Sequence, residues 1–289
     1  MVSTSSGSQQ KLDNDAKCDT FGALRRILGA NSSAQRIFGE ATGFSLLLTT
    51  LHSFQNDSEN EETESSLLTH MKIFGFLMRA MTAAVYSNPV NRIRLHTILS
   101  SNTFYDLLSE SGLLCVDCEK HVILLLLELA LEVVLPPTSN LQVESISSEN
   151  PEDESGFLSA TSFGLSRLDK ERIYNASAVV VLIRSLLVFT PKVQLELLRF
   201  IEKLANAGPF NQENLTSVGM DSNCFVTSVS FTLAGEFALC YSCPFCYTGC
   251  VGLLLETINP FLEGSSPILN HALRIVEVLG AYRLVIFDG

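Results

Sequence analysis

The sequence predicts an all-α protein, an armadillo/HEAT-like α-solenoid of about ten helices with disordered acidic loops between them. The composition is the first indication. The 289 residues are 46% hydrophobic but only 8% aromatic and contain no Trp, which suits helices packed on helices better than a β-sandwich. The second indication is apolar residues at steps of three and four, and the third is an internal repeat.

Composition divides the chain into five segments. Residues 1–19 are polar and are expected to be a disordered leader. Residues 20–135 form a first armadillo-like helical block. Residues 136–175 open with two prolines, turn acidic and are expected to be a flexible linker. Residues 176–283 form a second armadillo-like helical block, and 284–289 are expected to be an irregular tail.

The helices follow from apolar spacing. Amphipathic helices are expected over 67–86 and 194–204. The most apolar runs, 121–135 and 178–189, are shorter than the roughly 20 apolar residues that span a bilayer, and both carry charges. We therefore expect both to be buried core helices. Four prolines stand where a helix is expected to begin: Pro89, Pro191, Pro209 and Pro267.

An internal repeat supports the solenoid. Residues 34–48 (AQRIFGEATGFSLLL) align with 211–219 (NQENLTSVG) continued by 250–255 (CVGLLL), provided that 220–249 are skipped. A looser copy covers 91–108. Each copy is expected to form a short helix, a turn and a strongly apolar helix. One copy cannot bury its apolar face alone, so stacking is expected to make the chain fold.

The segment 220–249 interrupts one copy of the repeat between its two helices. It is rich in Phe, Ser and Cys, contains no Lys, Arg or His, and follows no helical period. Removing it restores the register of the repeat. We therefore hypothesise that the segment is a translated retained intron, which a continuous exon across codons 215–255 would contradict.

Four cysteines in or beside this segment raise the question of a metal site: Cys240, Cys243, Cys246 and Cys250, spaced C-x2-C-x2-C-x3-C. The spacing resembles that of bacterial ferredoxins, but Val251 stands where those proteins have Pro, and there the fourth Cys ligates another cluster. Four thiolates suffice for zinc, although the two-residue gaps strain a single tetrahedral site. We expect no metal and no cofactor, and a zinc or iron–sulfur module on these residues is the alternative.

Other candidate chemistry is sparse. Cys115 and Cys118 are expected to lie in the turn before a helix, with Asp117 as its N-cap, rather than to act as a redox pair. Glu128 and Glu132 share a helical face and are expected to be the solvated edge of a buried helix rather than an acid–base pair. The sequence contains no nucleophile-elbow, phosphate-loop or dinucleotide motif, so no catalytic residue is expected.

The five histidines are scattered and none has metal-ligand spacing, so each is expected to be a helix-surface or half-buried residue: His52, His70, His96, His121 and His271.

The net charge of −12 argues against direct nucleic-acid binding, which needs clustered Lys and Arg. The sequence contains two close pairs of arginines, Arg25–Arg26 and Arg92–Arg94. They are expected to contact acidic loops or a membrane surface at most, and to form no basic patch. The N-terminus lacks the basic start and apolar run of a signal peptide. We therefore expect a cytoplasmic protein whose eight cysteines stay reduced.

A resemblance to a known family is carried by four segments: 32–55, 88–108, 193–219 and 251–283. They resemble the armadillo-like amino-terminal region of the very large BEACH-domain proteins, most closely the plant SPIRRIG-like branch. The most specific phrases are FGEATGF and NQENLTSVG, within a general likeness of repeat texture.

The resemblance implies a non-enzymatic fragment of a large cytosolic scaffold linked to vesicle and endomembrane trafficking. The PH-like, BEACH and WD40 modules of that family do not occur in this sequence, so no functional residue is carried over. The partners are expected to be other proteins, bound through solenoid helix faces. Any membrane association is expected to be peripheral and indirect.

Overall fold

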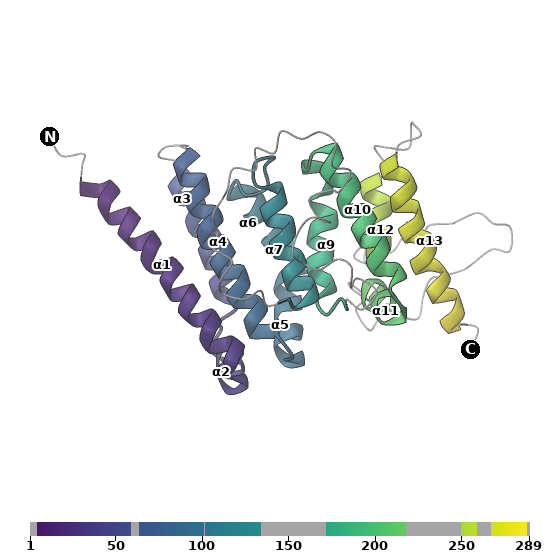
Figure 1. Cartoon of the computed structure of the whole chain (residues 1–289), viewed down its shortest axis with the longest axis horizontal. Coiled ribbons are helices and arrows are strands. Elements are labelled where there is room, and N and C mark those ends of the chain that lie inside the picture. Colours follow the sequence, from purple (N-terminus) through teal and green to yellow (C-terminus); the bar gives the residue numbers. More distant parts are fainter. Residues whose placement is uncertain are drawn as a thin grey trace, which may run out of the picture. The chain divides into compact units, whose positions relative to one another are not determined.

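Prolines and apolar spacing place the helices where the sequence predicts them. The computed structural model describes residues 5–58, 64–100, 102–133, 172–217, 250–258 and 267–287. Within these ranges the regular structure consists of twelve α-helices and one short 3-10 helix, with no strand, so the all-α prediction is confirmed (Figure 1). The chain divides into two compact units, 1–156 and 157–289, with the boundary inside the predicted linker.

The described residues of the first unit form seven helices: α1 (Ser5–Ala30), α2 (Ser32–Glu40), α3 (Ser45–Ser58), α4 (Glu64–Val85), α5 (Pro89–Leu99), α6 (Asn102–Glu110) and α7 (Glu119–Leu131). α5 begins at Pro89, as predicted, because the missing N–H of Pro is one that the first turn leaves without a helical partner. α4 corresponds to the predicted amphipathic helix 67–86 and buries Phe74, Leu77 and Met78.

In this unit, helices three apart along the chain pack together (Figure 1). α4 contacts both α1 and α7, α2 contacts α5, and α3 contacts α6. Such pairing is what a stacked repeat of three helices produces. The repeat copy 34–48 spans α2 and the start of α3, and the copy 91–108 spans α5 and α6, so equivalent parts of the copies contact each other. Three helices per repeat favour an armadillo-like over a HEAT-like arrangement, which stays a prediction.

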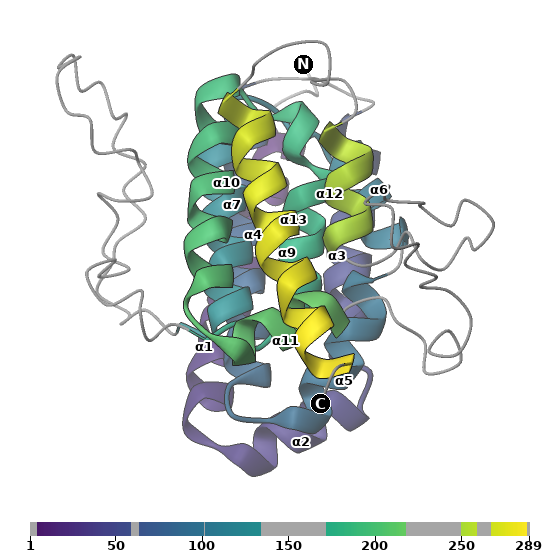
Figure 2. The same cartoon turned by 90° about the vertical axis from the view of Figure 1, so that its right-hand side faces the viewer.

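The described residues of the second unit form a 3-10 helix and five α-helices: α9 (Ala176–Arg184), η2 (Leu186–Val188), α10 (Pro191–Asn206), α11 (Pro209–Ser217), α12 (Cys250–Ile258) and α13 (Pro267–Phe287). The three-step pairing recurs, with α9 against α12 and α10 against α13 (Figure 2). The predicted split copy is α11 followed by α12, which contact each other. Residues 218–249 between them lie outside the described residues, so the retained-intron hypothesis stays a prediction.

The two most apolar runs form core helices, as predicted. Eight residues of α9 are buried, from Ala176 to Ile183, and α7 buries nearly its whole length. Among the described helices, none combines the length and the apolar character that crossing a membrane requires.

The phrase FGEATGF (38–44) forms the end of α2 and the turn into α3. Thr42 has a φ of 58°, in the left-handed region. At Gly43 a Cβ would lie 2.5 Å from both the ring and the carbonyl oxygen of Phe38. Phe38 and Phe44 pack edge to face with ring centroids 5.3 Å apart. The segment FGEATGF, on which the family resemblance partly depends, is therefore required for the packing of this turn.

Two short helices begin with the same combination of Pro and buried Asn, which the sequence analysis did not predict. α5 and α11 each have Pro at the first position and a buried Asn at the third, Asn91 and Asn211. Each Nδ2 donates to a carbonyl seven residues earlier, that of Ala84 at 2.9 Å and that of Leu204 at 2.8 Å. These carbonyls belong to the last turn of the preceding long helix, where helical donors run out. The pattern P-x-N-x3-L thus joins successive helices.

Replacing Asn211 with Ala is expected to destabilise the second unit by about 2 kcal/mol. The carbonyl of Leu204 and the N–H of Ile173, 2.8 Å from Oδ1, would each lose a buried partner. Amide hydrogen exchange in α10 and α11 measures the effect. The control is Asn206→Ala, because the exposed Asn206 bonds only within α10 in the described structure. Equal exchange in the two variants would contradict the prediction.

Three predicted boundaries are wrong. The leader 1–19 is largely helical, because α1 begins at Ser5 and packs its apolar side against α4, burying Cys18. The linker 136–175 ends early, because Ile173 and Asn175 are buried and Asn211 binds the N–H of Ile173. The tail 284–289 is helical to Phe287, because α13 continues beyond the predicted end of the repeat.

Candidate functional site

The predicted alternative metal site falls mostly outside the described residues. Cys240, Cys243 and Cys246 lie in the undescribed segment 218–249. Cys250 is the first residue of α12 and is buried, and burial raises the pKa of its thiol to about 12. A buried, protonated thiol is a poor ligand. In the described part of the chain, no group of three His, Cys, Asp or Glu side chains is placed to hold a metal ion.

The C-x-x-C pair lies in the turn before α7, as predicted. The N–H of Cys118 donates to the carbonyl of Cys115 at 3.1 Å. Burial, together with a hydrogen bond to Cys115, raises the pKa of the Cys118 thiol, which does not favour a reactive thiolate. The predicted N-cap Asp117 is wrong by one residue. Cys118 occupies that position and its side chain makes no capping bond.

Glu128 and Glu132 are not a solvated edge, and that prediction is wrong. Both carboxylates are only 3% exposed, and each pairs with an arginine from another helix. Arg79 of α4 donates to Glu128 through Nε at 3.1 Å and Nη2 at 3.3 Å. Arg92 of α5 donates to Glu132 through Nη2 at 2.7 Å. These are interhelical ion pairs, a structural role rather than an acid–base one.

A small charged cluster surrounds Glu128 inside the first unit. Burial raises the pKa of Glu128, while Arg79 and then Arg25 of α1 oppose the rise. Burial lowers the pKa of His121 to about 4, with the charge of Arg79 adding to the effect. The Nε2 atom of His121 is buried and has no hydrogen-bond partner among the described residues. The cluster couples α1, α4 and α7, the three helices that pack side by side.

Two of the remaining histidines are helix-surface or half-buried residues, as predicted, whereas a third is buried. His52 is exposed and His96 is half-buried. His70 is buried and stacks on Phe54, with ring centroids 4.3 Å apart. His271 belongs to a polar network between α10 and α13 that is described below.

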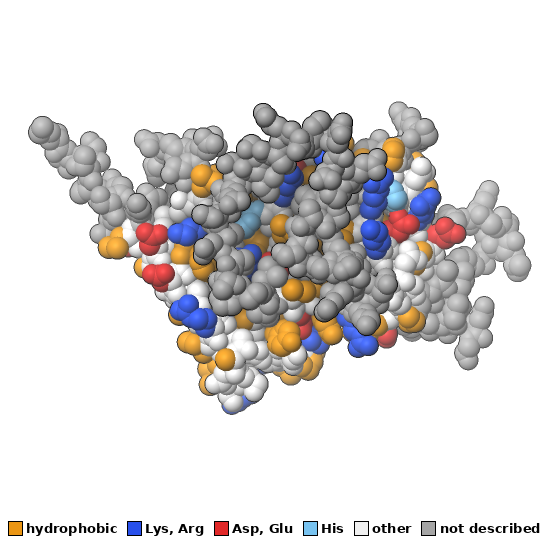
Figure 3. All heavy atoms as spheres, in the orientation of Figure 1, with side chains coloured by type: hydrophobic (Ala, Val, Ile, Leu, Met, Phe, Trp, Pro, Cys, Tyr) orange, Lys and Arg blue, Asp and Glu red, His pale blue; other side chains and the backbone are white. Residues whose placement is uncertain are grey.

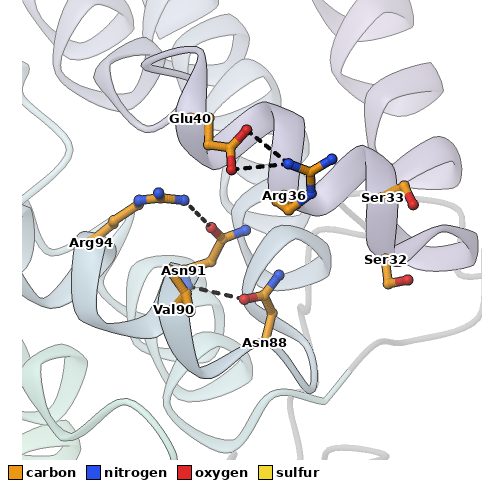
Figure 4. A pocket seen from close by; sticks show the side chains of 8 residues that line it. All are labelled: Ser32, Ser33, Arg36, Glu40, Asn88, Val90, Asn91 and Arg94. Carbon is orange, nitrogen blue, oxygen red and sulfur yellow. Dashed lines mark hydrogen bonds and ion pairs between the residues drawn. The ribbon is translucent and has the colours of Figure 1, made fainter.

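An open recess of about 400 Å³ lies between α2 and the start of α5 (Figure 4). Its lining comes from these two helices and their caps: Ser32, Ser33, Arg36, Glu40, Asn88, Val90, Asn91 and Arg94. Figure 4 shows Arg36 reaching Glu40, at 3.3 Å, and Arg94 reaching Oδ1 of Asn91, at 3.1 Å. Because the two arginines already bond to residues of the recess, its geometry singles out no ligand.

Gly39 allows α5 to approach α2 beside this recess. A Cβ there would overlap Oδ1 of Asn91, a buried residue whose Nδ2 donates to the carbonyls of Gln35 and Ala84. Gly39→Ala is therefore expected to cost about 2 kcal/mol, measured by hydrogen exchange in α2 and α5. Gly29→Ala in α1 is the control, since a Cβ there meets nothing within 4 Å. If the two variants are equally stable, the close approach is not limiting.

The exposed side of α10 carries a line of basic residues. Lys192, Arg199 and Lys203 are spaced by seven and four residues, which places them on one helical face. The opposite face is buried through Leu197 and Ile201. Figure 3 shows basic side chains gathered over α10. The sequence analysis did not predict this line, because it considered only arginines adjacent or nearly adjacent in sequence.

A network on the neighbouring helix α13 fixes one member of this line. Nε of Arg199 donates to Nε2 of His271 at 3.3 Å. His271 therefore carries its proton on Nδ1, which donates to Glu202 at 2.5 Å. Arg274 lies 3.8 Å from the other oxygen of Glu202. We call Lys192, Arg199, Lys203 and Arg274 together the α10 face.

Two proteins of Arabidopsis thaliana are similar to this chain along almost all of its length. The chain is 55% identical to Protein SPIRRIG over 284 residues and 54% identical to BEACH domain-containing protein A2 over 286 residues, in both cases over 98% of the chain. The chain is homologous to a segment of the plant SPIRRIG-like BEACH-domain proteins. The resemblance inferred from the sequence is confirmed.

The match to these BEACH-domain proteins covers only about 7% of the length of each. No protein-family profile and no solved structure matches the chain. The helical units described above therefore give a structure for one short stretch of a SPIRRIG-like sequence.

Proposed function

We propose that this chain is a non-enzymatic, helical protein-interaction module of a large BEACH-domain scaffold that acts in vesicle and endomembrane trafficking. The observation that supports this is the identity of 54–55% to two BEACH-domain proteins along 98% of the chain. Stacked helices offer long faces that hold partners through many modest contacts. The module is cytoplasmic, and it reaches endomembranes peripherally, through its partners.

An exchange of segments in Arabidopsis thaliana tests the proposal. The stretch of SPIRRIG that matches this chain is deleted, and is then replaced by this chain or by the matching stretch of BEACH domain-containing protein A2. We expect deletion to abolish the trafficking traits that depend on SPIRRIG, and both replacements to restore them at equal protein levels. Normal traits in the deletion line, or no rescue by an equally abundant replacement, would count against an interaction module.

The alternative, a zinc or iron–sulfur module on Cys240, Cys243, Cys246 and Cys250, is favoured by no observation among the described residues. Its one described member, Cys250, has a buried thiol within α12. Elemental analysis of the purified chain separates the two functions. We expect substoichiometric zinc and iron, whereas one metal ion or cluster per chain would favour the alternative.

A further inference from the structure

The described residues of the second unit carry a small excess of positive charge. The described residues of that unit carry seven Lys and Arg against five Asp and Glu, in a chain whose net charge is −12. The other residues together are therefore strongly acidic. Four of the seven cations make up the α10 face, on two helices that contact each other.

The acidic residues near this face leave its positive charge in excess. Glu202 accepts a hydrogen bond from His271 and pairs with Arg274, so its charge is matched by Arg274 on the α13 side. Among the described residues, Lys192 and Lys203 are exposed and lie in no ion pair. Exposed cations on a helix face that is otherwise without an apolar stripe suit a charged partner rather than an apolar one.

We propose that the α10 face binds an extended acidic segment of a partner protein, whose Asp or Glu side chains pair with Lys192, Arg199 and Lys203. The inference rests on the proposed function as a protein-interaction module, and it names the chemistry of the partner and the helix that receives it.

The spacing of the face matches an extended peptide. Lys192 and Lys203 are eleven residues apart, which is about 16 Å along a helix that rises 1.5 Å per residue. An extended segment that rises about 3.3 Å per residue covers this length with about five residues. Its side chains alternate in direction, so acidic residues at every second position face the helix together.

The charge pattern favours a peptide over a membrane surface or a nucleic acid. Glu196 lies on the same line between Lys192 and Arg199, and Glu202 lies beside it. A membrane or a nucleic acid is anionic over its whole surface and would bring negative charge close to both carboxylates, which would repel it. A peptide avoids this by placing a neutral or basic residue opposite Glu196, so the interruption in the basic line becomes a source of specificity.

The test uses the full chain and a fluorescein-labelled peptide of alternating Glu and Ser, with fluorescence anisotropy at low salt. The variant reverses three charges: Lys192→Glu, Arg199→Glu and Lys203→Glu. The matched control reverses three exposed cations of the first unit and has the same net charge: Arg26→Glu, Arg36→Glu and Lys72→Glu. Far-ultraviolet circular dichroism confirms that both variants remain helical.

We expect the unaltered chain and the control to bind the peptide, and the α10 variant to bind it at least tenfold more weakly. We also expect binding to weaken as salt is raised, because exposed ion pairs are screened. No binding by the unaltered chain, or equal binding by all three proteins, overturns the proposal. Binding of the unaltered chain to phosphatidylserine vesicles but not to the peptide overturns it in favour of a membrane surface.

The α10 variant also separates this inference from the proposed function. In the segment exchange, rescue by the unaltered chain together with rescue by the α10 variant would leave the interaction module standing and remove the α10 face from it. Rescue by the unaltered chain alone supports both. No rescue by either, at equal abundance, is the failure of the proposed function itself.

Discussion

Replacing Glu132 with Gln is expected to lower the free energy of unfolding of the first unit by about 3 kcal/mol. The carboxylate is 3% exposed and accepts bonds from Nε and Nη2 of Arg92. Removing its charge takes this ion pair away from the Arg92 guanidinium, which is itself only 25% exposed. Breaking one side of a buried pair costs more than the pair contributes relative to apolar residues, because the remaining charge stays desolvated.

The same carboxylate also holds two strained backbone positions. Glu132 ends α7 in the left-handed conformation, with a φ of 52°, and its Oε2 accepts the N–H of Ser87 at 3.1 Å. Ser87, in the turn between α4 and α5, has a φ of 54°. Non-glycine residues in this region cost about 1 kcal/mol each and persist only where other contacts hold them. The ion pair is therefore expected to fix the junction of α4, α5 and α7.

An exposed ion pair in the same unit provides the control. Arg36 and Glu40 lie one turn apart on α2, at 65% and 49% exposure, and such pairs contribute at most about 0.5 kcal/mol. Glu40→Gln should leave hydrogen exchange in α5 and α7 unchanged, whereas Glu132→Gln should accelerate it by about a hundredfold. Equal exchange in the two variants would mean that the buried pair contributes little to this junction.

The fate of Glu128 and Glu132 shows what sequence patterns can and cannot predict. Their spacing correctly places them on one face of a core helix. Their partners, Arg79 and Arg92, stand 49 and 40 residues earlier in the chain. The periodicity within 121–135 says nothing about such distant partners. The helical face that was predicted to be solvated is therefore buried, and its two carboxylates are paired with arginines.

The first helix fails as a prediction for a similar reason. The composition of residues 1–19 predicts disorder, because the few apolar residues of this segment form no continuous stripe. α4 supplies the missing surface, and α1 packs along it with Cys18 and Phe21 buried. Starts at proline, by contrast, depend only on local backbone chemistry. Those at Pro89, Pro191, Pro209 and Pro267 are all confirmed.

The α10 face, the candidate interaction site, could be predicted from the sequence only in part. The line Lys192, Arg199 and Lys203 is visible in the sequence once charges are counted on the helical period rather than as neighbours. The contribution of α13 is not visible, because His271 and Arg274 meet Glu202 only when the helices pack. A sequence therefore predicts the helix that offers a face more readily than the residues that complete it.

The stability of the first unit is expected to fall on mild acidification because of His121. Burial, with the charge of Arg79, lowers the pKa of the folded-state ring from 6.5 to about 4. Between these two pH values the unfolded chain binds a proton that the folded chain does not. The contribution of the neutral ring is therefore fully present above pH 6.5 and is lost as the pH falls toward 4, by about 3 kcal/mol in total and about 2 kcal/mol by pH 5.

The titration of Glu128 changes the stability of the first unit in the opposite direction, so its effect has to be separated from that of His121. Burial raises the pKa of its carboxyl above the ordinary value. Its contribution to stability is thus present at low pH and is lost as the pH rises through the folded-state pKa. The total acid profile of the chain mixes both effects, so only the difference between the unaltered chain and a variant at His121 isolates the ring.

His121→Gln removes the titrating ring and is expected to flatten the profile. Between pH 7.5 and pH 5, urea unfolding should show the unaltered chain losing about 2 kcal/mol more than this variant. His52→Gln, at an exposed position on α3, should follow the unaltered chain. Nuclear magnetic resonance titration of the His121 ring provides a direct check, with a midpoint near 4 expected. A midpoint near 6.5 would show that water reaches the ring, and that α1, α4 and α7 do not enclose the cluster that couples them.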